Sequence, residues 1–133
     1  MLRSDASVSA EIGRWGRLDI RPGYYVYVGS AFGPGGVRAR VLRHCREVQN
    51  KHWHIDYLRE FANLASVWYS HSPVRLEHPW AEALAGMKEM RPVKGFGCSD
   101  CKCESHLFFV ARKLILARFA NAVPGAVKSW SCD

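Results

Sequence analysis

The sequence predicts one domain of the α/β class, of the α+β kind, in which helices cover a small antiparallel or mixed sheet. Its 133 residues fit a single domain, and an apolar share of 48% is enough to fill one core. One early segment has the composition of a strand, and later segments carry apolar residues at helical spacing. Because the predicted helices gather together in a mixed order of elements, we expect them to pack over a small sheet.

The N-terminal part is predicted to form strands. Apolar residues alternate loosely over residues 7–20, and Gly13, Gly16 and the pair Pro22-Gly23 punctuate them. Tyr24–Ser30 is rich in β-branched and aromatic residues, so it is the clearest strand.

Two helices are predicted after a glycine- and proline-rich loop at residues 33–36. The first covers Val37–Val48, because its apolar residues recur at spacings of four, four and three. These residues are Val37, Val41, Cys45 and Val48. The second covers Trp53–Asn63, with Ile55, Leu58 and Ala62 facing inward.

The second half is predicted to mix short strands with a third helix. Pro79 suits the first turn of that helix, where its missing N–H is tolerated. The residues expected to be buried by it are Trp80, Ala81, Leu84 and Ala85. The other expected elements are a strand at Ala65–Tyr69, a turn-rich link at Met90–Gly97, a strand at His106–Val110, and either a helix or a strand at Ile115–Ala122.

The charge of the chain is basic, with 19 Lys and Arg against 12 Asp and Glu, a formal net charge of +7. This balance favours anionic partners such as nucleic acid, although a soluble protein can also be basic without such a partner. The basic residues form a local patch consisting of Arg38, Arg40, Arg43 and Arg46, with Lys51 just beyond. Since no apolar run reaches the roughly 20 residues of a membrane span and Met1–Ile12 lacks an apolar signal core, we expect a cytoplasmic protein with no membrane partner.

Several blocks of sequence occur in the order found in a known nuclease superfamily. Residues 23–31 read Gly-Tyr-Tyr-Val-Tyr-Val-Gly-Ser-Ala, and Arg40, Arg43 and His44 follow them. This arrangement resembles the second half of the GIY-YIG nuclease motif. Residues 51–58 (Lys-His-Trp-His-Ile-Asp-Tyr-Leu), residues 95–103 (Gly-Phe-Gly-Cys-Ser-Asp-Cys-Lys-Cys) and residues 105–107 (Ser-His-Leu) extend the resemblance to a GIY-YIG subfamily that is sometimes fused to endonuclease-III-type DNA glycosylases.

The resemblance spans about residues 11–110 and implies a metal-dependent endonuclease that hydrolyses phosphodiester bonds in DNA. It implies branched or damaged DNA as the partner, a role in DNA repair, and a functional link to a DNA glycosylase. Phosphodiester hydrolysis needs a base, a cationic clamp and a Lewis acid.

Each of these roles has a candidate residue. The resemblance assigns Tyr27 to the activation of water, and cationic neighbours are expected to lower its pKa from about 10 so that it can act as a base. Arg40 is the candidate clamp, because its guanidinium can grip a phosphate with two N–H groups and it shares a helix face with His44. We expect His44 to contact the phosphate or the attacking water. The candidate flanking phosphate contacts are Arg38, Arg43, Arg46 and Lys51.

The segment His52-Trp53-His54-Ile55-Asp56 is the densest polar group in the sequence. It offers His54 as a second catalytic histidine, or a histidine of this segment as a metal ligand. An imidazole oriented by a carboxylate and packed under Trp53 is an equally good structural explanation.

The resemblance also implies a divalent cation, Mg²⁺ or Mn²⁺, held by a glutamate. Glu77 fits the subfamily pattern Glu-x-x-x-Ala, whereas Glu82 lies inside the predicted third helix, where the wider superfamily places its glutamate. Glutamates near helix starts also occur simply because they interact favourably with the helix dipole.

The chain departs from the superfamily pattern in two places. The Gly-x-Tyr half of the motif is missing from its expected position, and Met1-Leu2-Arg3 looks like the end of that strand, so we expect a single domain over residues 1–133 with a truncated first strand. The asparagine that many members carry after the third helix is absent, and the cysteine-rich segment at residues 95–110 occupies that region.

Three of the five cysteines fall within this segment, which we regard as a cysteine-containing C-terminal extension. The odd count argues against a disulfide framework. The set Cys98, Cys101, Cys103 and His106 offers four ligands suited to Zn²⁺. The alternatives for the cysteines are a redox pair, a turn with buried thiols, or a metal site completed by His52, His54 or Asp100. Ser99 and Asp100 are also candidates for the phosphate site.

The sequence therefore leaves three functions open. The first is a metal-dependent DNA endonuclease. The second is a catalytically inactive nucleic-acid-binding module, stabilised by zinc, which would show salt-sensitive affinity without any need for Mg²⁺. The third is a zinc or thiol protein whose basic charge is incidental.

Overall fold

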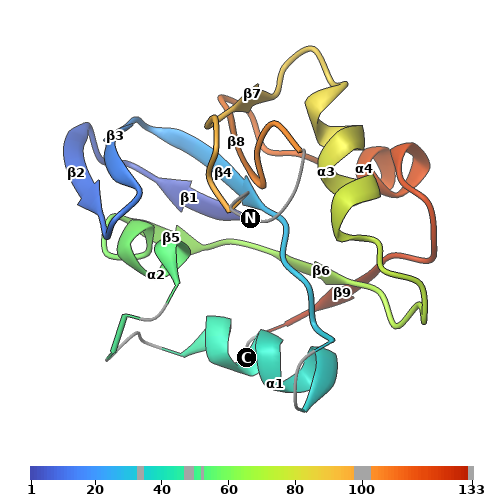
Figure 1. Ribbon diagram of the computed structural model, residues 1–133. Coiled ribbons are helices and arrows are strands. Elements are labelled where there is room, and N and C mark those ends of the chain that lie inside the picture. The colour runs from blue at the N-terminus through green and yellow to red at the C-terminus, as the bar shows by residue number, and fades with distance from the viewer. Residues whose placement is uncertain (33–34, 47–49, 52, 98–102, 132–133) are drawn as a thin grey trace.

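The computed structural model describes residues 1–32, 35–46, 50–51, 53–97 and 103–131. A five-stranded antiparallel sheet, in the order β5-β1-β4-β8-β7, forms its centre (Figure 1). The strands are β1 (Leu2–Ser4), β2 (Val8–Ile12), β3 (Gly16–Ile20), β4 (Gly23–Tyr27), β5 (Ala62–Leu64), β6 (Val67–Tyr69), β7 (Arg91–Pro92), β8 (Leu107–Val110) and β9 (Lys128–Trp130). The helices are α1 (Gly36–Cys45), α2 (His54–Leu58), α3 (Glu77–Ala85) and α4 (Leu116–Ala122). The mixed architecture confirms the predicted α+β class.

Both faces of the central sheet are apolar, because side chains alternate between them along each strand. On β4, Tyr25 belongs to one buried cluster and Val26 to the other. On β8, Leu107 and Phe108 divide in the same way. A sheet with two buried faces needs a covering layer on each side.

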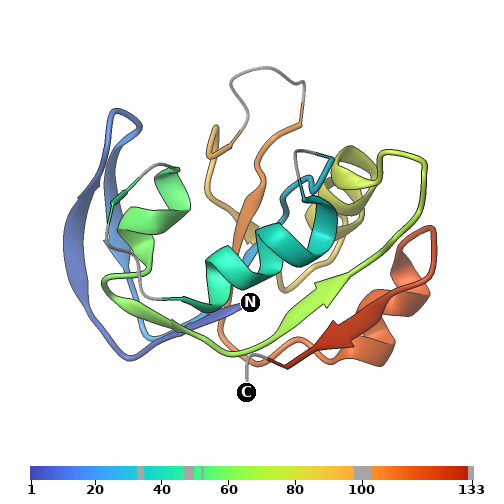
Figure 2. The ribbon, with the colours of Figure 1, turned by 90° about the horizontal axis from the view of Figure 1, so that it is seen from below.

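Different elements cover the two faces. The hairpin of β2 and β3 and the short helix α2 cover the face that carries Tyr25 and Leu107, through residues such as Ile12 and Leu58. Helices α3 and α4 contribute Leu84 and Phe119 to the cluster on the other face. Helix α1 lies apart from both layers, beyond the end of β4, and the β6–β9 pair runs toward it (Figures 1 and 2). None of the helices in the described ranges combines the length and the apolar character that a membrane span requires.

The second predicted helix is the main correction to the sequence-based elements. Helix α2 ends at Leu58 instead of continuing to Asn63. A turn at Arg59–Phe61 follows, and Ala62 then pairs with Ser4 of β1 as part of strand β5. The helical spacing of Ala62 was therefore misleading, because pairing with a distant strand decided its conformation.

Other elements differ less from the prediction. Strand β4 ends at Tyr27, three residues before the predicted boundary, and α3 begins at Glu77, two residues before Pro79. Ala85 is exposed, contrary to the prediction, whereas Ala81 and Leu84 are buried as predicted. The undecided segment forms helix α4, and the turn-rich link contains β7. Strand β9 was not predicted, because its pairing with β6 connects segments that lie far apart in the sequence.

Candidate active site

A cavity of about 410 Å³ opens beyond the end of β4. Four of the candidate residues line it: Tyr27 from β4, Arg40 and His44 from α1, and Glu77 from the first turn of α3. A volume of this size lies within the usual range for small-molecule sites. The fold thus brings together residues that are separated by up to fifty positions in the sequence.

Arg40 is held against the end of β4. Its guanidinium lies close enough to Tyr27 to influence the pKa of the phenol, and it lies against the backbone of Gly29. A Cβ atom added to Gly29 would lie 2.6 Å from the Arg40 Nη2 atom, so a larger residue would displace the guanidinium. The glycine of the Tyr-Val-Gly sequence is therefore explained by packing, because a residue without a Cβ atom leaves room for the Arg40 guanidinium.

Trp53 supports the arginines of α1 from a second direction. The guanidinium carbon of Arg40 lies 4.2 Å from the centroid of the Trp53 ring, and that of Arg43 lies 4.1 Å from it. Cations attract the negative face of an indole ring at such distances. Trp53 thus restricts the orientation of the arginine that lines the cavity.

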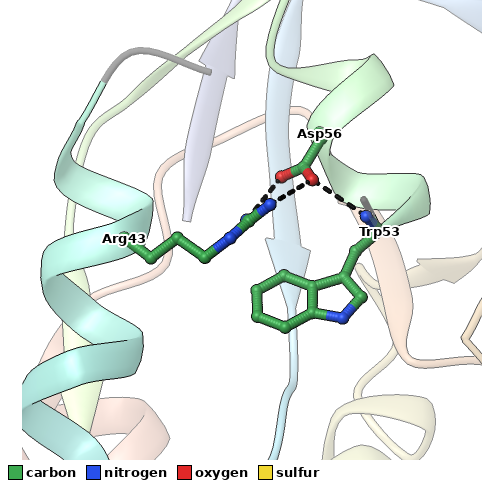
Figure 3. Close-up of polar contacts among 3 residues, drawn as sticks. All are labelled: Arg43, Trp53 and Asp56. Atoms are coloured by element: carbon green, nitrogen blue, oxygen red, sulfur yellow. Dashed lines mark hydrogen bonds and ion pairs between the residues drawn. The ribbon is translucent and has the colours of Figure 1, made fainter. Parts of the chain in front are cut away.

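Asp56 fixes the position of Trp53 and connects helices α1 and α2 (Figure 3). Its side chain is fully buried and accepts two hydrogen bonds from Arg43, at 2.9 and 2.8 Å. It also accepts a 2.9 Å hydrogen bond from the backbone N–H of Trp53, which caps the start of α2. Among the described residues, this carboxylate therefore orients an arginine and a helix end, while His52, one of the histidines predicted to lie beside a carboxylate, is outside the described residues.

Tyr27 is largely buried, and this overturns one expectation about its acidity. Burial raises the pKa of Tyr27, and the opposing effect of Arg40 does not cancel that rise. Glu77 and Asp56 raise the pKa of Tyr27 further. The phenol is therefore protonated at neutral pH and acts as a hydrogen-bond donor, so it is not the pre-ionised base that the cationic neighbours led us to expect.

His44 is the stronger candidate for a proton acceptor. Burial lowers the pKa of His44 to about 4, and Arg40, Arg59 and Arg43 lower it as well. The imidazole is therefore neutral at pH 7 and keeps one unprotonated ring nitrogen. Its ring centroid lies 6.4 Å from that of Tyr27 and 5.6 Å from the Trp53 ring.

Arg59 is a lining residue that the sequence did not single out. Its Nε and Nη1 atoms are buried without a hydrogen-bond partner among the described residues. Burial lowers the pKa of Arg59, yet an arginine remains charged in proteins. A buried cation with unmet N–H groups at a cavity wall is suited to an anionic ligand. No sequence pattern distinguished Arg59 from the other arginines.

The two alternative glutamates differ in their positions. Glu77 lines the cavity, and its Oε1 atom lies 2.9 Å from the Nδ1 atom of buried His106. Burial lowers the pKa of His106, although Glu77 opposes this effect. Glu82 is exposed on α3 and is not among the described residues that line the cavity.

His54 lies behind the cavity wall. Its ring packs at 5.9 Å from Phe96, which in turn packs at 6.2 Å from Tyr27. It is not one of the described lining residues. The structure therefore separates His54 from the group formed by Tyr27, Arg40, His44 and Glu77.

The candidate nucleic-acid contacts have different environments. Arg38 and Arg46 are exposed on and just after α1. Both terminal nitrogens of Arg43 are engaged by Asp56, which directs this side chain into the protein. Lys51 is exposed and forms an ion pair with Glu60.

The predicted zinc ligands Cys98 and Cys101 lie outside the described residues, as do His52, Ser99 and Asp100. Cys103 and His106 lie together, and His78, which the sequence did not indicate, joins them. Cys45 is disulfide-bonded, although the odd cysteine count argued against a disulfide framework.

Comparisons of the chain with curated proteins and with solved structures find no match. A family model described as domain of unknown function DUF123 matches residues 1–127. Since the match covers nearly the whole chain, the protein belongs to the DUF123 family.

Proposed function

We propose that this protein is a metal-dependent endonuclease that hydrolyses phosphodiester bonds in DNA, acting in the cytoplasm and in DNA repair, as its resemblance to GIY-YIG nucleases implies. The observation that carries the proposal is the cavity at the end of β4, whose wall combines Tyr27, Arg40, His44 and Glu77. These residues supply a hydroxyl, a cation, a neutral imidazole and a carboxylate. That is the set of groups that hydrolysis of a phosphodiester requires.

Arg40 and Arg59 would hold the scissile phosphate. Arg40 is held between the Trp53 ring and the backbone of Gly29, so its guanidinium loses little freedom on binding. Arg59 lines the same cavity, and its positive charge would attract a phosphate bound there. Both cations would also stabilise the negative charge that develops on the phosphate in the transition state.

His44 would accept the proton of the attacking water. The water oxygen forms a bond to phosphorus, the proton passes to the unprotonated ring nitrogen of His44, and the bond to the leaving oxygen breaks. With a pKa of about 4, His44 is available in its neutral form at pH 7. The protonated Tyr27 hydroxyl would orient the water by hydrogen bonding, because burial keeps its pKa above the ordinary value.

Glu77 is the residue that would hold Mg²⁺ or Mn²⁺. Such hard cations prefer oxygen ligands and are commonly bound by one carboxylate together with substrate phosphates. Glu77 fits this role, since it lines the cavity and its Oε2 atom is left for a cation when Oε1 contacts His106. A bound divalent cation would supply charge stabilisation for the leaving oxygen.

The alternative of a catalytically inactive nucleic-acid-binding module is supported by a different observation. Arg38 and Arg46 are exposed, so they can contact phosphates without the cavity. Binding through such cations weakens steeply with salt and needs no Mg²⁺.

The test is cleavage of supercoiled plasmid and branched DNA with Mg²⁺ or Mn²⁺ by wild type and two pairs of variants. Arg40→Ala is paired with Arg38→Ala, because Arg38 is exposed on the same helix. Glu77→Gln is paired with Glu82→Gln, because Glu82 is an exposed glutamate of the same helix, a little more than one turn after Glu77. We expect Arg40→Ala to reduce the cleavage rate by about 10²–10³-fold, the usual effect of removing a transition-state donor.

The control variants separate the hypotheses. At saturating DNA, Arg38→Ala and Glu82→Gln should cleave within about threefold of wild type, since neither is among the described lining residues and a flanking phosphate contact of Arg38 would affect the affinity for DNA alone. Equal cleavage by wild type, Arg40→Ala and Glu77→Gln would reject the proposed site. Salt-sensitive DNA binding without cleavage by wild type would instead favour the binding module.

A further inference from the structure

A second group of chemically reactive side chains lies outside the proposed catalytic group, at the start of α3 and just before β8. His78, Cys103 and His106 each place a ligand atom within 4.8 Å of the other two. Donor atoms around a tetrahedral zinc ion lie roughly 3.3–3.8 Å apart, given Zn–N and Zn–S bonds of about 2.0–2.3 Å. The three side chains therefore need only small adjustments to bind one ion.

The backbone holds His106 in a defined position within this group. Its N–H donates to the carbonyl of Phe96 at 2.8 Å, and its carbonyl accepts from Val28 at 2.9 Å. Gly97 allows a close approach, because a Cβ atom there would lie 3.1 Å from the His106 Cβ atom. Next to it, Ser105 is buried and its hydroxyl bonds to the backbone of Val93 at 2.6 Å.

Glu77 orients the His106 ring. The contact of 2.9 Å between Nδ1 and the Glu77 Oε1 atom selects the tautomer with the proton on Nδ1. In this tautomer Nε2 is unprotonated, and its lone pair is free of the Glu77 contact. Histidines that bind metals commonly donate their other N–H to a carboxylate in this way. With Nδ1 engaged by Glu77, Nε2 would be the ligand atom of His106 and Glu77 its supporting carboxylate.

We propose that His78, Cys103 and His106 form a zinc-binding site in which Glu77 positions His106. Two imidazoles and one thiolate are ligands that Zn²⁺ prefers over Mg²⁺ or Ca²⁺, and three protein ligands leave a fourth position open. The ion would tie the first turn of α3 to the segment that precedes β8. Since Glu77 lies in that same turn, the ion would also steady the carboxylate at the cavity.

Metal binding can be measured without any nucleic acid, so the test does not depend on the proposed nuclease. Purified full-length protein is titrated with Zn²⁺ against a chromophoric chelator, and with Co²⁺ as a spectroscopic probe. We expect one tightly bound Zn²⁺ per chain, together with the visible bands of tetrahedral Co²⁺ and a sulfur-to-cobalt charge-transfer band in the near ultraviolet.

Variants identify the ligands. Cys103→Ser should abolish the charge-transfer band, and His78→Ala should weaken Zn²⁺ binding by at least about 10-fold. His71→Ala is the matched control, because His71 is an exposed histidine that does not belong to the group, and it should bind like wild type. His78 is itself exposed, so His78→Ala tests the site even if Cys103→Ser does not fold.

Glu77→Gln tests the positioning role separately. It should weaken Zn²⁺ affinity by about 10- to 100-fold while the Co²⁺ spectrum keeps its thiolate band. Failure of wild type to bind Zn²⁺ would overturn the proposal. Full Zn²⁺ binding by both His78→Ala and Cys103→Ser would also overturn it, because other residues would then hold the ion.

Discussion

Arg43 and Asp56 join helices α1 and α2 through two hydrogen bonds of 2.9 and 2.8 Å, and the carboxylate is fully buried. The same carboxylate accepts the backbone N–H of Trp53, whose ring lies against Arg40. Asp56, which is not among the described residues that line the cavity, thus positions Trp53 against Arg40, which is one of them.

Asp56→Asn should lower the free energy of unfolding by about 3 kcal/mol. Removing one partner of a buried ion pair leaves the other charge without compensation, and such changes cost about 3–5 kcal/mol; the lower end applies because Arg43 is 31% exposed. Urea denaturation measures the change. Asp19→Asn, at an exposed position, should remain within about 0.5 kcal/mol of wild type. Equal losses in both variants would contradict the buried role of Asp56.

Gly29→Ala should reduce DNA cleavage by about 10- to 100-fold while leaving the fold intact. The added methyl group would lie 2.6 Å from the Arg40 Nη2 atom and would push the guanidinium aside. A misplacement of about 1 Å can reduce a rate by about 100-fold. Gly86→Ala is the control, because a Cβ atom there would meet its nearest neighbour at an ordinary 3.5 Å. Unchanged cleavage by Gly29→Ala would show that Arg40 tolerates displacement or is not required.

Arg59→Met should keep or raise stability and weaken phosphate binding. The Nε and Nη1 atoms of Arg59 are buried without a partner among the described residues, and each such group costs about 1–3 kcal/mol. We therefore expect the free energy of unfolding to stay level or rise by about 1 kcal/mol. In thermal unfolding, added pyrophosphate should stabilise wild type more than the variant.

Arg112→Met, at an exposed position between β8 and α4, should respond to pyrophosphate like wild type. A loss of more than about 1 kcal/mol in Arg59→Met would mean that attraction to Asp56 outweighs the unmet N–H groups, since Asp56 favours the charged form of Arg59.

His44 should make stability depend on pH between about 4 and 6.5. Its pKa is about 4 in the folded protein and about 6.5 in the unfolded chain, so the unfolded state binds more protons within this window. Stability is therefore complete above about pH 6.5 and falls as the pH is lowered toward 4, by roughly 2 kcal/mol from this residue. The free energies of unfolding at pH 7 and pH 4.5 measure the effect.

His44→Asn supplies the comparison for that measurement. Asparagine does not titrate, so the variant should lose less stability than wild type between the two pH values. An identical pH dependence in the two proteins would show that His44 is not the buried neutral histidine described above.

Local composition and spacing correctly predicted those helices and strands whose conformation is decided by residues close together in the sequence. The dense β-branched and aromatic segment forms β4, and the stripe that begins at Val37 forms α1 with Val41 buried. Loose alternation over residues 7–20 indicated the region of β2 and β3, and the strand predicted at His106–Val110 is β8. These patterns were sufficient to predict the α+β class.

Sequence reasoning failed where distant pairing competed with local pattern. Ala62 has helical spacing from Leu58, yet it lies opposite Ser4 in the sheet. The acidity of Tyr27 was also mistaken, because the sequence indicated its cationic neighbours but could not indicate how completely it is buried. His78 and Arg59 carried no local pattern, since their roles come from neighbours elsewhere in the chain.

The sequence by itself determined the class of fold and the basic helix, because these depend on residue type and on spacing along one element. The candidates Tyr27, Arg40, His44 and Glu77 came from the resemblance to GIY-YIG nucleases. Only the tertiary structure distinguished Glu77 from Glu82 at the cavity, turned Arg43 toward Asp56, and grouped His78 with Cys103 and His106. These relationships depend on how deeply a side chain is buried and on which side chains lie near it. Both are decided by contacts between segments that are far apart in the sequence, so the sequence pattern does not reveal them.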